Sequence, residues 1–157
     1  MQVKDIMQTQ IISVQLGTTL SQLLNIFKDF HSFPIVPVTN KEQTLLGIVQ
    51  MRSLFDIFQP YHHNILMHNP LSMLSQETTD IFDIDIDENI GFLIIIADII
   101  DKKVVSIQED KDIKQAYDLM QLHKRDTITV IDQEHHLKGI ISSFDIVMSV
   151  FKEKGIF

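Results

Sequence analysis

A serine and an aspartate three positions apart, Ser142 and Asp145, are the strongest candidates for chemistry in this chain. They follow a short apolar run and open a stretch with helical spacing, so they stand at a strand-to-helix junction. An ionised carboxylate at such a place can accept hydrogen bonds from two neighbouring hydroxyl groups of a ligand. The same Ser-x-x-Asp spacing is also a capping box, which would only satisfy the first amides of the helix. Both roles stay open, and they can coexist.

Three histidines in the middle of the chain, His62, His63 and His68, invite a metal site. They lack the i, i+4 helical spacing and the nearby carboxylate that a compact zinc site needs. Histidines are common in surface loops, so we expect these three to bind no metal.

The run from Asp83 to Glu88 alternates aspartate with isoleucine and superficially resembles a calcium-binding loop. An EF-hand loop needs glycine at its sixth position and a bidentate glutamate at its twelfth, where this chain has Glu88 and Ile94. The alternation suits an edge strand with a charged outer face, or an acidic linker. A hydrolase that uses this run and a metal is kept only as the third of three functional hypotheses.

Composition and missing motifs disfavour several other functions. The 157 residues include five glycines and no cysteine, and the formal net charge is −8. The lack of cysteine excludes disulfides and thiolate-ligated metals, and the negative charge disfavours nucleic acid and anionic lipid as partners. No nucleophile–base pair, Walker loop or dinucleotide-binding glycine pattern is present. Because these motifs are missing, we expect no catalytic activity. The longest apolar stretch, residues 92–97, is too short to span a bilayer, so we expect a cytoplasmic protein.

The elements that must position these residues come from an internal repeat. Val3-Lys4-Asp5-Ile6-Met7 corresponds to Ile96-Ala97-Asp98-Ile99-Ile100. With a single one-residue gap, His31 then corresponds to His123 and Gly47 to Gly139. One such copy has too little interior to be stable alone, so we expect the two copies to pack together.

Each copy has the pattern of a strand, a helix, a strand, a polar turn, a strand and a helix. β-Branched and apolar residues predict strands at residues 35–38 and 127–131, and polar runs predict turns at residues 40–43 and 132–135. Apolar residues at i, i+3, i+4 and i+7 predict the amphipathic helices. The expected fold class is α/β (α+β), with two β-α-β-β-α repeats packed as a pseudo-two-fold pair.

The repeat also sets the expected domain boundaries. We expect a first domain at residues 1–59 and a second at residues 96–157. The residues between them, 60–95, form an unusually long and acidic connection that can hold an extra helix or a lid.

The ordered motifs of the two copies resemble the CBS domain family. The second copy offers Leu119-Met120-Gln121-Leu122-His123, then Ile128-Thr129-Val130-Ile131-Asp132, then Gly139-Ile140-Ile141-Ser142-Ser143-Phe144-Asp145. The first copy offers Val3-Lys4-Asp5-Ile6-Met7 and Gly47-Ile48-Val49-Gln50-Met51-Arg52-Ser53. The resemblance implies an α/β disc whose two sheets face each other across a cleft, often as part of a dimer. It also implies an adenosyl ligand, such as AMP, ADP, ATP, S-adenosylmethionine or cyclic di-AMP.

The resemblance gives individual residues of the second copy a role in binding such a ligand. Asp145 would accept hydrogen bonds from the ribose hydroxyls, and Ser142 would contact ribose or phosphate. Adenine would lie in an apolar slot edged by backbone groups around Ser106 and Asp126-Thr127. Ile140, in the same motif as Ser142, completes the expected ligand-binding set.

The first copy departs from this pattern. Gln50 stands in place of the Ser or Thr and Ser53 in place of the aspartate, so one asymmetric site is expected and not two. Arg52 is a candidate phosphate contact, although an arginine at an exposed helix start is commonly only solvated. His31 and His123 match a helix-end position and are expected to interact with helix C-termini.

These observations predict a regulatory module that has no catalytic activity and requires no cofactor or metal. An adenine nucleotide or another adenosyl ligand would enter the cleft and change the placement of the two copies, or of two protomers in a homodimer. An effector protein would respond to that change, which requires that the ligand bind two states with different affinities. The alternative is a dimerisation or docking scaffold with a degenerate pocket, and no partnership with nucleic acid or membrane is expected.

Overall fold

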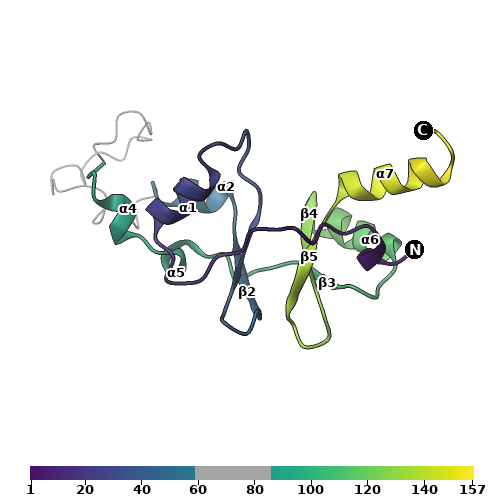
Figure 1. The fold of residues 1–157 in the computed structure, drawn as a ribbon, viewed down its shortest axis with the longest axis horizontal. Helices are drawn as coiled ribbons and strands as arrows, with labels where there is room; N and C mark the ends of the chain where they lie inside the picture. Colours follow the sequence, from purple (N-terminus) through teal and green to yellow (C-terminus); the bar gives the residue numbers. More distant parts are fainter. Residues whose placement is uncertain (59–85) are drawn as a thin grey trace.

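The computed structural model of the protein describes residues 1–58 and 86–157 (Figure 1). The predictions for His62, His63 and His68 and for the first part of the acidic run lie outside the described residues. In the remainder of that run, residues 86–88 form no strand and lead toward a helix that begins at Ile90.

From the first long helix onward, the two copies repeat one order of elements, which confirms the predicted pair of repeats. The first copy contains α1 (Leu20–Phe27), β1 (Val36–Thr39), β2 (Leu45–Val49) and α2 (Met51–Asp56). The second contains β3 (Ser106–Gln108), α6 (Ile113–His123), β4 (Thr127–Ile131), β5 (Leu137–Ser142) and α7 (Ser143–Glu153). Short helices precede both copies. The helix η1 (Val3–Asp5) precedes the first copy, and the helices α4 (Ile90–Leu93) and α5 (Ile96–Ile99) precede the second. The strands lie in the middle of the molecule, with α1, α2, α4 and α5 on one side and α6 and α7 on the other (Figure 1).

The helices begin where the sequence supplies a cap. Thr19 Oγ1 accepts a hydrogen bond from the Gln22 amide at 3.2 Å, and Asp112 Oδ1 accepts one from the Lys114 amide at 2.8 Å. Each cap satisfies an amide that the first turn of the helix leaves without a partner. In α1 the buried side chains are Leu20, Leu23 and Phe27, three of the four that the apolar spacing predicts; the fourth, Leu24, is exposed.

The sheet of the second copy has the order β3-β4-β5, in which β3 is parallel and β5 antiparallel to β4. The first copy has only the antiparallel pair β1-β2, and its expected first strand is reduced to one parallel bridge between Val14 and Val38. One cause is Pro37, which stands where the second copy has Thr129. The Thr129 amide donates to the Val105 carbonyl at 3.3 Å, whereas proline has no N–H with which to extend that ladder.

Each copy lends its leading residues to the other copy; we call residues 1–8 and 94–101 the crossing segments. In the first crossing segment, the Val3 amide donates to Lys111 O at 2.8 Å, and Gln8 pairs with Ile140 of β5. In the second, the Ile96 amide donates to Thr18 O at 2.9 Å, and Asp101 pairs with Ile48 of β2 in the same way. The N-terminus accordingly lies beside α6, at the far end of the molecule from α1 (Figure 1).

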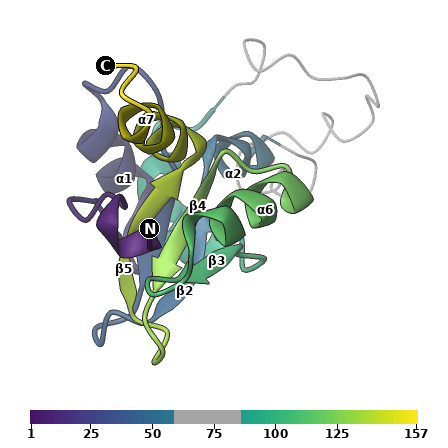
Figure 2. The ribbon, with the colours of Figure 1, turned by 90° about the vertical axis from the view of Figure 1, so that its right-hand side faces the viewer.

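The crossing segments complete the two hydrophobic cores. The fully buried Val3 packs in the second core, among side chains of α6, β4 and β5. Ile94, Ile96 and Ile99 pack in the first core, with side chains of α1, β1 and β2. Each core therefore draws on residues from both sequence repeats. Figure 2, in which the second copy faces the viewer, shows the N-terminal residues lying against β5.

Gly47 and Gly139, equivalent positions in the repeat, lie directly under the crossing segments. A Cβ on Gly139 would overlap the carbonyl oxygen of Gln8. A Cβ on Gly47 would come within 2.7 Å of the carbonyl oxygen of Asp101 and would also overlap the Ile100 side chain. Glycine is required at both places because a strand of one copy passes close to the backbone of the other.

The tips of the two β-hairpins also join the copies. The Leu45 amide donates to His135 O at 3.0 Å, and the Leu137 amide donates to Gln43 O at 2.9 Å. Gln43 and His135 occupy equivalent positions, and both have left-handed backbones, with φ of 65° and 64°. The left-handed residue ends each polar turn in a bulge, so both tips present the same backbone groups and pair symmetrically.

Candidate ligand site between the two copies

The Asp145 carboxylate lies at the start of α7, where the two repeats meet. Its Oδ2 accepts hydrogen bonds from the Ser142 amide at 2.8 Å and from the Ser142 hydroxyl at 2.6 Å. The Asp145 amide in turn donates to Ser142 Oγ at 3.2 Å, so the capping box is formed. Oδ1 faces the first crossing segment, from which Gln8 Nε2 donates at 3.2 Å. The carboxylate thus caps its helix and keeps acceptor capacity on Oδ1.

In the first copy, Ser53 does the capping without a carboxylate. Its buried hydroxyl accepts a hydrogen bond from the Gln50 amide at 3.2 Å, as Asp145 Oδ2 does from the Ser142 amide. A carboxylate is nevertheless close by, because Gln50 Nε2 donates to Asp101 Oδ2 of the second crossing segment at 3.4 Å. The carboxylate therefore lies on the crossing segment in this half of the molecule and on the helix in the other half.

A cavity of about 260 Å³ opens at Gln50, between the two copies. We call it the Gln50 cavity. The first copy contributes three of its lining residues and the second copy and its leading residues contribute the others: Ile35, Ile48, Gln50, Lys103, Val104, Val105, Lys124, Arg125, Asp126, Thr127, Ile128 and Thr129. Residues of β2 and β4 and apolar residues beside them form one part of the wall, and charged side chains form the other.

The family profile described as CBS domain matches residues 3–59 and 96–152. The chain belongs to the CBS domain family. The resemblance carried by the repeated motifs is thereby confirmed. A search of curated proteins found no match to this sequence.

Solved structures with the same fold support this assignment. The structure of CBSX2 in complex with AMP has a TM-score of 0.70 and 17% identity, with 98% of each chain covered. The CBS domain pair of protein MJ0100, in complex with 5′-methylthioadenosine and S-adenosyl-L-methionine, has a TM-score of 0.65 and 16% identity, again with 98% of each chain covered. The cytosolic domain of the Mg²⁺ channel MgtE, in complex with ATP, has a TM-score of 0.64 and 18% identity. There the match covers 94% of this chain but 48% of the other, so this chain spans about half the length of that cytosolic domain.

The CBS pair divides the predicted ligand-binding residues between two places. Asp126 and Thr127 line the Gln50 cavity. They also adjoin the α7 start, because Thr127 pairs with Ser142 and the Ser143 amide donates to Asp126 O at 2.8 Å. Asp145 lines a different hollow. The start of β4 therefore lies between the Gln50 cavity and the capping box of Ser142 and Asp145.

The other predicted residues lie in the sheet or on the surface. Ser106 of β3 and Ile140 of β5 are half-buried and both pair with Thr129 of the central strand β4. Arg52 lies exposed on α2 and is not part of the Gln50 cavity wall. The sequence reasoning did not propose Lys103, Lys124 or Arg125, although the repeat places the last two immediately after the helix-end residue His123.

Asp145 lines an open groove of about 680 Å³ between the N-terminus and α7 of the CBS pair. The apolar part of its wall comes from Met1, Ile6, Met148 and Phe157. The cleft residues Asp126 and Thr127 do not line this groove. The Asp145 carboxylate is thus accessible from the groove between the N-terminus and α7.

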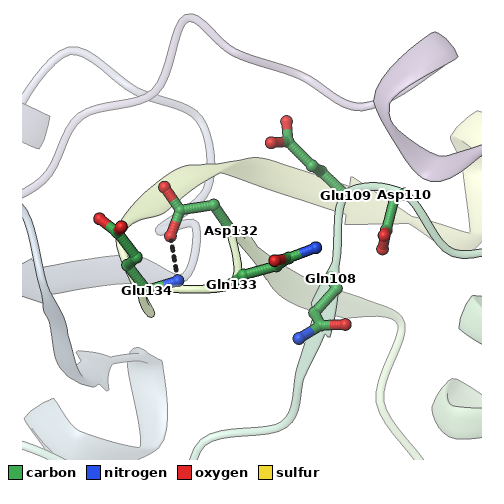
Figure 3. Close-up of a pocket in the computed structure, with 6 residues that line it drawn as sticks. All are labelled: Gln108, Glu109, Asp110, Asp132, Gln133 and Glu134. Atoms are coloured by element: carbon green, nitrogen blue, oxygen red, sulfur yellow. Dashed lines mark hydrogen bonds between the residues drawn. The ribbon is translucent and has the colours of Figure 1, made fainter.

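Figure 3 shows an acidic hollow of about 380 Å³ between the β3–α6 loop and the β4–β5 turn. Four carboxylates line it, on Glu109, Asp110, Asp132 and Glu134. In residues 1–58 and 86–157, no group of three or more histidine, cysteine, aspartate or glutamate side chains is placed to hold a metal ion. Likewise, no helix in those ranges is long and apolar enough to cross a membrane.

Asp132 in that hollow has a structural role. Its Oδ1 accepts hydrogen bonds from the amides of His136 and Glu134, each at 2.9 Å, the second of which is drawn in Figure 3. His136 Nδ1 lies 3.2 Å from Oδ2. The bond from the His136 amide, with the other contacts to His136 and Glu134, holds the pKa of Asp132 below its ordinary value of 3.8. The charged carboxylate therefore stabilises the hairpin tip.

Replacing Asp132 with asparagine is expected to flatten the dependence of stability on pH in acid. Asparagine fits this turn, because Asn40 holds the equivalent place and accepts from the Thr44 amide at 2.9 Å. A carboxyl whose folded pKa is lowered contributes its full stability above the ordinary value and loses it as the pH falls through the folded pKa. In urea titrations from about pH 4 downward, the parent chain should lose stability faster than Asp132→Asn. Parallel curves for the two proteins would contradict this role.

Proposed function

We propose that this CBS pair is a non-catalytic regulatory module that binds an adenosyl ligand in the cleft between its two copies. The observation that carries the proposal is the Gln50 cavity, whose wall comes from both copies and the second crossing segment. A ligand bound there would contact both repeats at once and would favour one relative placement of them. The complexes of CBSX2 with AMP, MJ0100 with S-adenosyl-L-methionine and MgtE with ATP support this class of ligand.

The proposed ribose contact is Asp145, with Ser142 beside it. Asp145 does not line the Gln50 cavity but a neighbouring hollow across the start of β4, so this contact is proposed in addition to the cavity. Its Oδ1 accepts one hydrogen bond, from the exposed side chain of Gln8, which a ligand hydroxyl group can replace. Thr127 pairs with Ser142 across the β4–β5 ladder, so the proposed adenine edge adjoins the proposed ribose contact. Ser106, Asp126 and Ile140 remain parts of this proposed site.

A cytoplasmic location, a homodimer and an effector protein belong to the same proposal. Large apolar side chains exposed on α6 and α7, those of Leu122, Phe144 and Val147, are available for contact with a second copy. The alternative function, a dimerisation or docking scaffold without a ligand, shares this surface but needs no occupant in the cleft.

Ligand binding should raise the thermal stability of the intact chain. A ligand that binds only the folded protein stabilises it by about 2.7 kcal/mol at a hundred times its dissociation constant. A thermal-shift series with AMP, ADP, ATP, cyclic di-AMP and S-adenosylmethionine tests this directly. A shift with any one of them supports the proposal, and the absence of a shift with all five favours the scaffold.

Asp145→Ala is the variant that separates ligand contact from capping. Loss of hydrogen bonds to an ionised carboxylate should weaken the bound ligand by about tenfold or more. Asp112→Ala is the matched control, because it also removes an aspartate that caps a helix, here α6. Both variants should lose about 1 kcal/mol of stability through the missing cap. Equal affinity in the two variants would show that Asp145 is only a cap.

A further inference from the structure

The backbone contacts of the two crossing segments do not distinguish one copy from the other. Gln8 exchanges two backbone hydrogen bonds with Ile140 of β5, of 2.9 and 3.0 Å. Asp101, its equivalent in the repeat, exchanges two of the same lengths with Ile48 of β2. A segment that pairs in this way with β5 would pair equally well with β2. The backbone alone therefore does not decide which copy each segment joins.

The polar residue at the end of each segment does distinguish the copies, because each meets its chemical complement. Gln8 Nε2 donates to the two carboxylate oxygens of Asp145, at 3.2 and 3.5 Å. Asp101 Oδ2 accepts a hydrogen bond from Gln50 Nε2 at 3.4 Å. The helix start is thus acidic where the segment brings an amide, and it is neutral where the segment brings an acid.

The surroundings of Gln50 also favour a carboxylate on the segment. Arg125 Nη1 donates to Gln50 Oε1 at 3.1 Å, and the same amide group donates to Asp101. The positive charge of the guanidinium therefore lies one side chain away from the carboxylate, which it stabilises. A neutral glutamine in place of Asp101 would gain nothing from that charge.

The reverse assignment, with each crossing segment on its own copy, would bring like groups together. The first segment on β2 would place Gln8 beside Gln50, and the second on β5 would place Asp101 beside Asp145. Two carboxylates repel each other, and neither has a donor for the other. Both favourable contacts to a carboxylate would be lost at the same time.

We propose that the two glutamine–aspartate pairs assign each crossing segment to the opposite copy. Gln8 and Asp101 are positioning residues in this arrangement, and Asp145 and Gln50 are the groups that they recognise. Such pairs discriminate through the cost of the wrong contacts as well as through the gain from the right ones. The inference goes beyond the proposed function, because it holds whether or not a ligand binds.

The test introduces the contacts of the reverse assignment into the observed fold. Gln8→Glu sets a second carboxylate against Asp145, and Asp101→Asn sets a second amide against Gln50. Both substitutions keep the shape of the side chain. The asparagine also keeps the Oδ1 atom that accepts from the Lys103 amide at 2.9 Å. The double variant therefore changes the charges of the two pairs and leaves the net charge of the chain unchanged.

Hydrogen exchange of the full chain measures how often each segment opens, because the Ile140 and Ile48 amides donate to the two segments. In the double variant, exchange should rise about tenfold at Ile140, where a repulsion is added, and about threefold at Ile48, where only a charge is lost. Gln10→Glu with Asp118→Asn is the matched control, since it makes the same two changes at exposed residues outside the pairs. Exchange at both amides should stay at the level of the parent chain in this control.

Two comparisons separate selection from simple stabilisation. Gln8→Ala removes the amide without adding a charge, so Gln8→Glu should raise exchange at Ile140 about threefold more than Gln8→Ala does. Potassium chloride at about 1 M should remove most of this difference, because it screens the repulsion. In an Asp145→Asn background, Gln8→Glu should no longer raise exchange, since the carboxylate then faces an amide.

The opposite results would overturn the inference. One is a Gln8→Glu variant that opens no more often than Gln8→Ala, or whose excess opening salt leaves unchanged. Another is an equal effect of Gln8→Glu with and without the Asp145 carboxylate, which would show that the two side chains do not act as a pair. A rise in the control as large as that in the double variant would attribute the effect to general electrostatics instead.

Discussion

Replacing Ile96 with alanine is expected to lower the free energy of unfolding by about 2 to 5 kcal/mol. Ile96 is fully buried in the first core, although the repeat assigns it to the second copy. Its removal leaves a cavity among side chains that α1, β1 and β2 contribute. Urea denaturation of the intact chain measures the loss. Ile12→Ala is the control, because Ile12 is 40% exposed and its truncation should cost far less.

Hydrogen exchange locates the effect of the same substitution. If the second crossing segment belongs to the first core, amides of β1 and α1 should lose protection in Ile96→Ala before those of α6 and β4 do. Faster exchange confined to α6, β4 and β5 would instead mean that each copy closes its own core, and that the exchange of crossing segments is wrong.

Gly139→Ala is expected to destabilise the chain by about 3 kcal/mol and to loosen the first crossing segment. The added Cβ would overlap the Gln8 carbonyl oxygen, and the segment, held to β5 by two backbone hydrogen bonds of 2.9 and 3.0 Å, must move away. Limited proteolysis should then cut within residues 1–12 sooner than in the parent chain. Thermal denaturation gives the loss of stability.

Gly17→Ala is the control for this substitution, because no atom lies within 4 Å of the place that its Cβ would take. It should leave stability within about 1 kcal/mol of the parent chain. Gly47→Ala should behave like Gly139→Ala, since its Cβ would meet Asp101 O and the Ile100 side chain. Neutral behaviour of both glycine variants would show that the crossing segments have room to shift.

The sequence contained most of the fold because the repeat and the helical spacing are local signals. Leu20, Leu23 and Phe27 at helical spacing are buried as expected, whereas Leu24 of the same spacing is exposed. Ser142 caps its helix as the Ser-x-x-Asp spacing predicts. A first strand was expected in the first copy and is reduced to the single bridge between Val14 and Val38. A longer first strand would need an N–H donor at position 37 of β1, and proline has none. The residues of the first strand itself do not reveal this.

The crossing segments show where local patterns stop being informative. The apolar residues around Val3 and Ile96 in the sequence predict that both side chains are buried. They do not predict which of the two cores each side chain enters. Gly47 and Gly139 are the residues whose type indicates where the crossing segments lie. Glycine in a strand pattern indicates close backbone approach, and the approaching backbone is the crossing segment of the other copy.

The candidate site was predicted only in part for the same reason. Ser142 and Asp145 form the box that their spacing predicts, and the structure adds Gln8, from the far end of the chain, to the Asp145 carboxylate. The charge of the Gln50 cavity depends on Lys103 and Arg125, which are distant in sequence and each unremarkable alone. Only their common position beside Gln50 makes them a candidate site.

The exchange of crossing segments also fixes when the first core can form during synthesis. Ile94, Ile96 and Ile99 complete that core, yet the ribosome adds them after the whole first copy has been made. At about 5 to 20 residues per second, roughly 2 to 8 seconds pass between the end of α2 and the arrival of these isoleucines. During that interval α1, β1 and β2 must keep an unfilled apolar face in the presence of the cell's chaperones. The first core therefore closes only after residues 94–99 have been added, although the other elements that form it end at α2.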